Sequence, residues 1–519
     1  MTAGDAGWRP EVEELRRREE LARRMGGTEK VARQHSIGKL TVRERIDSLL
    51  DDGSFREVGT TTGRGTYENG ELVDLLPTNV VIGRGRIDDR PVVVGGDDFT
   101  VRGGASDAFI IKKQVHAEQM AHELRLPLVR MVDGTGGGGS IRSLIEMGRT
   151  YVPALPGWDV IVGNLSTVPV VALALGPCAG FGAARVTASH YAVMVRGMSQ
   201  VFTAGPPVVA AIGQNVTKEE LGGADVHGTN GTIDDVVDSE EEAFARARRF
   251  LSYLPSSVHE VSARVEPTDD PERAEDWLVD AVPRNPRQVY KVREILEAVV
   301  DTGSFMEIGR GHGKAAVTGF ARLDGWPVAI LANDPYVYGG SWGAAAARKV
   351  ERFVDLAHTF HLPVVNFVDN PGVLIGTGPE QEGAIRAGVR TISAIYQADV
   401  PWCSVVLRKV FGVGGAGHSN HTKMQYRFAW PSADWGSLPS AGGIEAAYRA
   451  ELELLEDPQA RVAELQEQLT QISTPFRTAE QFDIEQIIDP RETRSLLCDF
   501  ARLAAPLRTA GPTLRGMRP

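Results

Sequence analysis

A glycine-rich turn between an apolar run and a helix is the feature of this sequence best suited to chemistry. Residues 168–175 read as a buried strand, which leads through Gly-Pro into Cys-Ala-Gly-Phe-Gly-Ala-Ala and a helix. The first N–H groups of a helix are unpaired and carry the positive end of its dipole, so two of them can hold a developing oxyanion. A phosphate-binding loop and tight packing of small residues are the alternatives. Neither G-x-x-x-x-G-K-[ST] nor G-x-G-x-x-G occurs here in a mononucleotide-binding context.

A second glycine turn, RKVFGVGGAGHSN at residues 408–420, follows another apolar run and has the same character. Basic side chains lie in or beside it, and no carboxylate does: Arg408, Lys409, His418 and His421. A single histidine near a glycine turn is most often structural or solvated. We therefore assign neither histidine a catalytic role.

A third glycine cluster, Asp-Gly-Thr-Gly-Gly-Gly-Gly-Ser, occupies residues 133–140. Its backbone N–H groups can cradle an anion or a pantetheine arm, and a plain flexible loop is an equally good interpretation. No Ser-His-Asp order, H-E-x-x-H motif or paired carboxylate motif accompanies these turns. Oxyanion-stabilising groups without a general base indicate that the base arrives with a substrate.

The elements that must position these turns occur twice. Each half has an amphipathic helix stopped by Asp-x-Gly-Ser-Phe, a hairpin with Asp-Asp or Asp-Gly, a helix leading through Leu-Pro to a strand, and a glycine turn. The matching segments are 43–59 with 292–309, 80–96 with 316–332, 121–136 with 357–372, and 168–184 with 400–417. The first pair is offset by 250 residues and the next two by 236, so the first copy carries an extra loop of 14 residues around 67–76.

Each copy thus predicts an α/β domain with a mostly parallel sheet flanked by helices. In such sheets, functional groups gather outside the carboxyl ends of the strands, where these glycine turns fall. Pro, Ser and charged residues replace periodic apolar residues at 251–277, which is typical of a linker. We expect two domains, residues 1–265 and 266–519. The charged stretch 451–471 predicts a packing or subunit-contact helix.

Composition narrows the class of protein. The chain has 519 residues, of which 42% are hydrophobic and 24% charged, so it can bury sizeable cores. The net charge of -12 argues against binding to nucleic acid or to anionic membranes. No apolar run is long enough for a membrane helix, the charged N-terminus lacks a signal-peptide core, and the three cysteines are far apart. A cytoplasmic protein is expected.

Several segments together resemble the carboxyltransferase (β) subunits of biotin-dependent acyl-CoA carboxylases, such as the propionyl-CoA and methylcrotonyl-CoA enzymes. The resemblance covers roughly residues 30–450. Its motifs are GKLTVRERIDSLLDDGSF (38–55), FTVRGGA (99–105), GPCAGFGAA (176–184), LGGADVH (221–227), LSYLP (251–255), FVDNPGVLIGT (367–377) and FAWPSA (428–433).

The resemblance implies two tandem crotonase-like (ββα spiral) domains, acyl-CoA bound by the first and carboxybiotin by the second. It implies that N–H groups at Gly180 and Phe181 hold the thioester enolate, and that Gly414, Gly415 or Ala416 serve biotin. Further glycines are expected to line the cofactor-binding surfaces: Gly103, Gly104, Gly134, Gly136, Gly137 and Gly372. The cofactors implied are biotin on a partner protein and coenzyme A as part of the substrate.

The resemblance also implies partners, because this chain has no biotinylation site and no ATP-grasp loop. These are a biotin carboxylase, a biotin carboxyl carrier (α) subunit, and further copies of this chain in a dimer-based hexamer whose active sites lie between subunits. No metal, nucleic acid or membrane is expected. A decarboxylase or transcarboxylase subunit is an alternative function, and a non-catalytic acyl-CoA-binding scaffold is another.

The chain departs from the family pattern at four places. Phe181 stands where the family has the second glycine of Gly-Gly, and the loop after Asp133 lacks the usual arginine, for which Arg142 is a candidate substitute. Gly417-His418 replaces Tyr-Asp after the second turn, and Gly339-Gly340-Ser-Trp-Gly is also unusual. These departures bear on the acyl group rather than on the reaction class.

Overall fold

The computed structural model describes residues 7–104, 110–134, 141–152, 154–437 and 440–519. The chain forms two compact units, Met1–Glu260 with Pro512–Pro519, and Val261–Gly511. The division between Glu260 and Val261 lies close to the expected boundary, and the last residues of the chain belong to the first unit.

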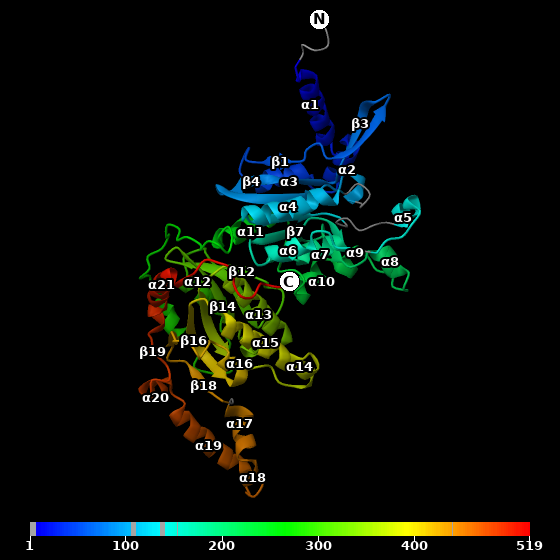
Figure 1. Cartoon of the computed structure of the whole chain (residues 1–519). Helices are drawn as coiled ribbons and strands as arrows, with labels where there is room; N and C mark the ends of the chain where they lie inside the picture. The colour runs from blue at the N-terminus through cyan, green and yellow to red at the C-terminus, as the bar shows by residue number, and fades with distance from the viewer. Residues whose placement is uncertain (1–6, 105–109, 135–140, 153, 438–439) are drawn as a thin grey trace. The chain divides into compact units, whose positions relative to one another are not determined.

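The first unit contains helices and strands with the following bounds: α1 (Arg9–Arg23), α2 (Thr28–Ser36), α3 (Val42–Leu49), β1 (Arg56–Val58), β2 (Gly63–Glu68), β3 (Glu71–Pro77), β4 (Val80–Ile87), β5 (Arg90–Asp97), η1 (Arg102–Gly104), α4 (Ile111–Leu124), β6 (Leu128–Val132), α5 (Ile141–Met147), α6 (Trp158–Asn164), β7 (Val170–Ala174), β8 (Pro177–Ala179), α7 (Phe181–Thr187), β9 (Tyr191–Val195), β10 (Gln200–Phe202), α8 (Pro206–Ala210), α9 (Lys218–Gly222), α10 (Ala224–Asn230), β11 (Asp235–Val237) and α11 (Glu240–Tyr253). Its main sheet has the order β1-β4-β5-β6-β7-β9-β11 (Figure 1). β1, β4 and β5 pair antiparallel, and the remaining neighbours pair parallel.

The second unit contains η3 (Asp276–Asp280), α12 (Val292–Val299), β12 (Met306–Ile308), β13 (Ala316–Leu323), β14 (Trp326–Asn333), η4 (Tyr338–Gly340), α13 (Ala344–Thr359), β15 (Val364–Asn370), α14 (Thr377–Gln381), α15 (Ala384–Gln397), β16 (Trp402–Phe411), α16 (Gly412–Ala416), β17 (Arg427–Ala429), β18 (Asp434–Gly436), α17 (Ser440–Ala447), α18 (Arg449–Leu452), α19 (Pro458–Ile472), α20 (Pro475–Glu480), β19 (Gln486–Ile487), η5 (Pro490–Glu492), α21 (Thr493–Ala504) and η6 (Ala505–Leu507). Its sheet runs β12-β13-β14-β15-β16-β17-β19, with the same antiparallel start and parallel remainder. The α/β prediction and the internal repeat are confirmed.

The repeated Asp-x-Gly-Ser-Phe motif has a structural purpose. The hairpins β4–β5 and β13–β14 turn at 88–89 and 324–325, where every residue has a positive φ. The carboxylate of Asp51 accepts both amides of the first turn, at 3.0 and 2.9 Å. Asp301 does the same for the second turn, at 3.0 and 2.8 Å. The motif therefore connects the end of a helix to the turn of β4–β5 in the first copy and of β13–β14 in the second.

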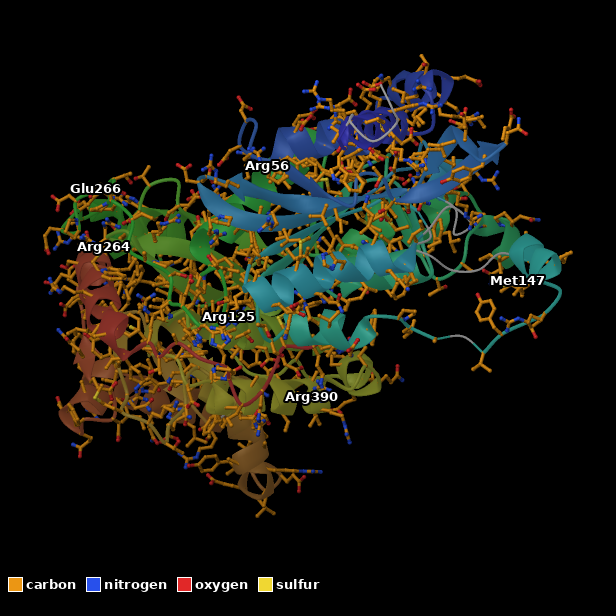
Figure 2. The ribbon with its side chains drawn as sticks, turned by 45° about the horizontal axis from the view of Figure 1, so that its top comes forward. Arg56, Arg125, Met147, Arg264, Glu266 and Arg390 are labelled. Atoms are coloured by element: carbon orange, nitrogen blue, oxygen red, sulfur yellow. The ribbon has the colours of Figure 1, made fainter. Side chains whose placement is uncertain are left out.

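Backbone conformation repeats as closely as the motifs do. Arg125, labelled in Figure 2, follows α4 with φ 56°, and His361 two residues after α13 has φ 60°. Both halves of the chain thus leave their helix through a left-handed residue before the Leu-Pro break. The shared geometry explains why the two copies feed their next strand into the sheet in the same way.

The extra residues of the first copy form a hairpin of their own, β2–β3. Figure 1 shows β3 beside α1, and Leu21 and Ala22 of that helix are buried in one cluster with Leu72 and Leu75. The insertion therefore covers the apolar side of the N-terminal helix.

Two expectations about helices need correction. Residues 251–253 belong to α11 rather than to a linker, because the apolar face that buries Phe244 and Ala247 continues to Leu251. The stretch 451–471 is broken between α18 and α19, because Pro458 has no N–H with which to continue a helix and begins a new one instead.

Gly340 lies so close to the neighbouring backbone that a side chain there should destabilise the protein. A Cβ on Gly340 (φ 91°) would lie 2.3 Å from the carbonyl oxygen of Asp369, whereas on Gly339 (φ 63°) the nearest atom would be 4.0 Å away. We expect Gly340→Ala to lower the free energy of unfolding by about 3 kcal/mol or more, and Gly339→Ala by about 1 kcal/mol. Urea denaturation of both variants checks this, and equal losses would contradict it.

Candidate active site

The first glycine turn lies at the carboxyl end of β7. The chain passes through the short strand β8 to Gly180, which has φ 56° and ψ −117°, and then enters α7 at Phe181. Side chains with a Cβ strongly disfavour this conformation. Gly180 is exposed, and a Cβ there would meet nothing closer than 3.9 Å, so conformation rather than space requires the glycine.

Some backbone N–H groups of this turn have a hydrogen-bond acceptor, and others do not. The Gly180 N–H donates to the carbonyl of Phe202 at 3.2 Å, so Gly180 supplies the conformation of the turn rather than a free donor. The N–H groups of Phe181, Gly182 and Ala183 have no acceptor in the part of the chain that the structure describes. The first turn of a helix directs such groups toward its N-terminal end, where an anion gains from both hydrogen bonds and the dipole. The Gly180 N–H is therefore not free for the donor role expected of it, whereas those of Phe181 and Gly182 have no acceptor among the described residues.

A buried ionic cluster supports this turn from below. Asp133, directly after β6, accepts from Lys39 at 2.6 Å and from Arg45 at 2.9 Å, both through Oδ2. Arg45 also pairs with Glu240 at 2.6 Å and donates to the carbonyl of Leu175 at 3.0 Å. The four charged side chains are almost completely buried, and burial lowers the pKa of Lys39 although Asp133 opposes that shift. Loss of one partner would leave an uncompensated buried charge.

Gly176 shows how closely the turn rests on this cluster. A Cβ at Gly176 would lie 1.9 Å from Oδ1 of Asp133 and 2.5 Å from the Lys39 amine. Among the described residues, Oδ1 has no hydrogen-bond partner. The ionic cluster can therefore lie against the turn only because Gly176 has no side chain.

The glycines expected to bind a cofactor in this unit divide into three kinds. Gly104 and Gly134 bring two loops into backbone contact, since a Cβ on Gly104 would lie 2.8 Å from the Asp133 carbonyl oxygen and 3.1 Å from the Gly134 Cα. Gly103 is exposed and has open space around it. Gly136 and Gly137 lie outside the described residues. The Ala179 N–H donates to the Gly134 carbonyl at 3.3 Å, which connects this loop to the turn.

Side chains at the turn are aromatic or unreactive. The ring of Phe181 packs against that of Trp158, with centroids 6.0 Å apart and planes inclined by 50°. Cys178 is buried, and burial raises the pKa of its thiol, so it remains neutral at physiological pH. The turn therefore presents backbone N–H groups, with the Phe181 ring beside them.

The second glycine turn has the same construction. β16 ends at Phe411, and α16 begins at Gly412, which has φ 57°. In the described part of the chain, the N–H groups of Val413 and Gly414 have no acceptor. By the offset of 232 residues the equivalent of Phe181 is Val413, which the sequence interpretation did not name.

Glycine packing holds this turn against the preceding loop. A Cβ on Gly414 would lie 2.7 Å from the carbonyl carbon of Gly372, and one on Gly415 would lie 2.8 Å from that of Val410. Asn370 bridges the two segments, since its amide donates to the Gly414 carbonyl at 3.0 Å and its oxygen accepts from the Gly372 N–H at 2.9 Å. Gly372, Gly414 and Gly415 are thus brought together, while Ala416 lies exposed beside them.

A buried aspartate lies under this turn as well. Oδ2 of Asp369 accepts from Arg408 at 3.0 Å and from the hydroxyl of Tyr290 at 2.9 Å, and Oδ1 accepts from the Lys409 amide at 3.0 Å. Asp369 is equivalent to Asp133 by the offset of 236 residues. Its partners come from different places in the sequence, so the two clusters share the aspartate and not the cations.

The two histidines have structural contacts. Nδ1 of His418 lies 2.8 Å from the carbonyl oxygen of Gly415, and Nε2 of His421 lies 2.9 Å from that of Ala416. Burial lowers the pKa of His418 to about 4, so its ring is neutral at pH 7 and Nδ1 carries the proton that it donates. Both rings therefore satisfy carbonyls of the short helix α16.

Membrane-spanning helices and metal-binding clusters are both absent from the described residues. No helix there is long and apolar enough to cross a membrane. No group of three or more His, Cys, Asp or Glu side chains there could hold a metal ion.

The chain is similar to known proteins over almost its whole length. Residues 33–513 match the family model for the carboxyl transferase domain, a span that includes both glycine turns. The propionyl-CoA carboxylase carboxyltransferase subunit of Haloferax mediterranei is 36% identical over 512 residues, which are 96% of this chain and 97% of that protein. The methylmalonyl-CoA decarboxylase subunit alpha of Veillonella parvula is 32% identical over 503 residues, 95% of this chain and 96% of that protein.

A solved structure matches over nearly the whole length. It is transcarboxylase 12S in a hexamer assembly, with methylmalonyl-coenzyme A and methylmalonic acid bound. The TM-score is 0.87 at 32% identity, and the match covers 98% of this chain and 97% of that chain.

Burial of His418 predicts a pH dependence of stability. Its pKa is near 6.5 in the unfolded chain and about 4 in the folded chain, so the unfolded state binds more protons between these values. Stability is therefore fully present above about pH 6.5 and is lost as the pH falls; by pH 5 we expect a loss of about 2 kcal/mol from this residue. Urea denaturation at pH 7 and pH 5 checks this.

The matched variants are His418→Asn and, at the exposed neighbour, His421→Asn. The first is less stable at pH 7 but loses about 2 kcal/mol less than the wild type between pH 7 and pH 5. The second keeps the wild-type dependence. An unchanged pH dependence in His418→Asn would contradict the assignment.

Proposed function

This chain belongs to the carboxyl transferase domain family and is an acyl-CoA carboxyltransferase, and we propose that it transfers a carboxyl group from carboxybiotin on a partner protein to the α-carbon, or a vinylogous position, of an acyl-CoA. The observation that carries the proposal is the pair of turns with unpaired amides, at Phe181–Gly182 and Val413–Gly414. Each follows a glycine with a positive φ, 56° at Gly180 and 57° at Gly412. A reaction that places negative charge on one oxygen of each substrate needs two such sites.

The first turn is proposed to hold the thioester oxygen. Loss of the α-proton moves charge onto that oxygen, and N–H groups fixed before the reaction stabilise the charge without reorganising. The glycines Gly104 and Gly134 keep the neighbouring loops close to the turn, so the donors stay fixed when substrate binds. We assign acyl-CoA binding to the N-terminal domain, residues 1–265.

The second turn is proposed to serve biotin, in the C-terminal domain at residues 266–519. A ureido carbonyl needs N–H donors and close access to the backbone, and Val413, Gly414 and the side-chain-free Gly372 fit both requirements. Carboxybiotin, when bound, supplies the carboxyl group and then a nitrogen that accepts the α-proton. The residues of this turn bind and orient the ring.

The ionisable groups beneath the first turn are not available as a base. Asp133 is engaged with Lys39 and Arg45, and the Cys178 thiol is neutral because burial raises its pKa. This supports a mechanism in which the protein holds charge through backbone amides and takes no proton from the thioester. It agrees with the sequence-based hypothesis that the base arrives with a substrate.

The proposed roles of the two turns imply partner proteins. We propose a biotin carboxylase and a biotin carboxyl carrier (α) subunit as partners, and a homo-hexamer of this chain, as transcarboxylase 12S forms. In this hexamer the first turn of one subunit would work with the second turn of another.

The reverse reaction is the second candidate. A decarboxylase subunit and transcarboxylase 12S resemble this chain about as closely as carboxylase subunits do. Carboxyl transfer uses the same two oxyanion sites in either direction, so partner proteins set the direction.

A panel of acyl-CoAs mixed with the purified chain and carboxylated carrier tests all of these functions. Acyl-CoA binding without transfer would favour the non-catalytic scaffold.

Removal of one amide proton at each turn tests the donors. Phe181 is the first residue of α7 and Val413 the second of α16, and the N–H groups of a first helical turn have no partner within the helix, so Phe181→Pro and Val413→Pro should fold while losing a single N–H. We expect kcat for carboxyl transfer to fall about 100- to 1000-fold in each. Circular dichroism and thermal unfolding verify that the variants fold.

Alanine variants at the same positions are the matched controls. Phe181→Ala and Val413→Ala lose the same side chains but keep the N–H, so they should retain transfer to a short acyl-CoA within about tenfold of the wild type. Equal activity of the proline and alanine variants at either turn would exclude that N–H as an oxyanion donor.

A further inference from the structure

An aromatic pair stands at the entrance to the first turn. Phe181 is the first residue of α7, and Trp158 is the first residue of α6. Both side chains are half-buried, and their rings are 6.0 Å apart between centroids, inclined by 50°. The same position in the second turn carries Val413, whose side chain is 63% exposed and small. Of the two glycine turns, therefore, only the first carries a large aromatic side chain at this position.

We infer that the Phe181–Trp158 pair determines which acyl groups this enzyme accepts, and that it restricts the substrate to short-chain acyl-CoA thioesters. This inference rests on the proposed function, in which the Phe181 amide binds the thioester oxygen. The proposal concerns specificity, whereas the donors act through the backbone.

Covalent geometry places the ring next to the reacting carbon. The amide nitrogen of Phe181 and its Cβ are bonded to the same Cα, and the α-carbon of an acyl group is bonded to the same carbonyl carbon as the oxygen that this amide holds. Side chains of a helix also lean toward its N-terminus, so the ring of a first-turn residue extends toward the end that receives the anion. An acyl chain that leaves the α-carbon on this side meets the ring within its first few carbons.

The ring is held rather than free to swing aside, because Trp158 belongs to an anchored helix. Asn164 at the end of α6 is fully buried and donates to the backbone carbonyl of Glu118 at 3.1 Å and to its carboxylate at 3.0 Å. Ile161 of the same helix is also buried. Aromatic pairs attract beyond the area that they bury, so Trp158 opposes rotation of Phe181.

Removal of the ring should open the site to longer chains. Variants Phe181→Ala, Phe181→Tyr and Trp158→Ala are compared with the wild type, each assembled with its biotin carboxylase and carboxylated carrier. The exposed Phe476→Ala in the second unit serves as a matched loss of an aromatic ring elsewhere. The substrates are acetyl-, propionyl-, butyryl- and hexanoyl-CoA.

The measured quantity is the ratio of kcat/KM for hexanoyl-CoA to that for propionyl-CoA. We expect this ratio to rise at least tenfold in Phe181→Ala and by a smaller factor in Trp158→Ala, because a few methylenes in an apolar pocket discriminate by at least that much. Phe181→Tyr and Phe476→Ala should keep the wild-type ratio. Calorimetric titration with the same acyl-CoAs, without the carrier, should show tighter hexanoyl-CoA binding to Phe181→Ala alone among the Phe181 variants.

The outcomes separate the two proposals. Transfer by the wild type with an unchanged ratio and unchanged binding in Phe181→Ala overturns the role of the pair and leaves the proposed function standing. A wild type that prefers hexanoyl-CoA to propionyl-CoA also overturns it. No transfer by the wild type to any acyl-CoA overturns the proposed function and this inference with it. If Phe181→Ala fails to fold, Phe181→Leu takes its place, since leucine is smaller than phenylalanine and cannot pair with Trp158, and a smaller rise in the ratio, as in Trp158→Ala, is expected.

Discussion

Asp133 and Asp369 are fully buried at the carboxyl ends of β6 and β15, and each carboxylate is neutralised by at least one cation within hydrogen-bonding distance. Placing such charges in a protein interior is unfavourable unless every charge has its partner, so these clusters are strongly constrained in geometry. Each connects adjacent strands just below a glycine turn: Arg45 reaches the carbonyl of Leu175, and Asp369 accepts from the Lys409 amide. Both clusters therefore hold the backbone that leads into the turns.

A second constraint comes from the backbone itself. Gly180 and Gly412 have nearly the same positive φ, and the helix after each presents amides without acceptors among the described residues. A residue keeps its backbone N–H whichever side chain it carries, so Phe181 presents an amide here as a glycine would. Where a Cβ would strike the neighbouring backbone, as at Gly104, Gly340 and Gly414, the chain has kept glycine.

Duplication has supplied two similar frameworks with different surroundings. The first turn has an aromatic pair beside it and a cluster containing Lys39, whereas the second has the small Val413 and an aspartate paired with Arg408. In the proposed function, this asymmetry separates a turn that must select an acyl group from one that binds an invariant ring. Carboxylase, decarboxylase and transcarboxylase relatives share the common framework, consistent with a reaction that can run in both directions.

The sequence by itself determined the repeat, the α/β class, both hairpins and the location of both glycine turns. These features depend on interactions between residues close in the chain, such as the Asp-Gly turns and the strand–glycine–helix pattern, and on a constant offset between copies. It did not determine which amides are free, because the Gly180 N–H is consumed by the carbonyl of Phe202, from a different strand. Nor did it show that Lys39, Arg45 and Glu240 meet around Asp133, or that Trp158 supports Phe181. Only the tertiary structure decided these, because each joins segments that are distant in sequence and become neighbours when the sheet forms.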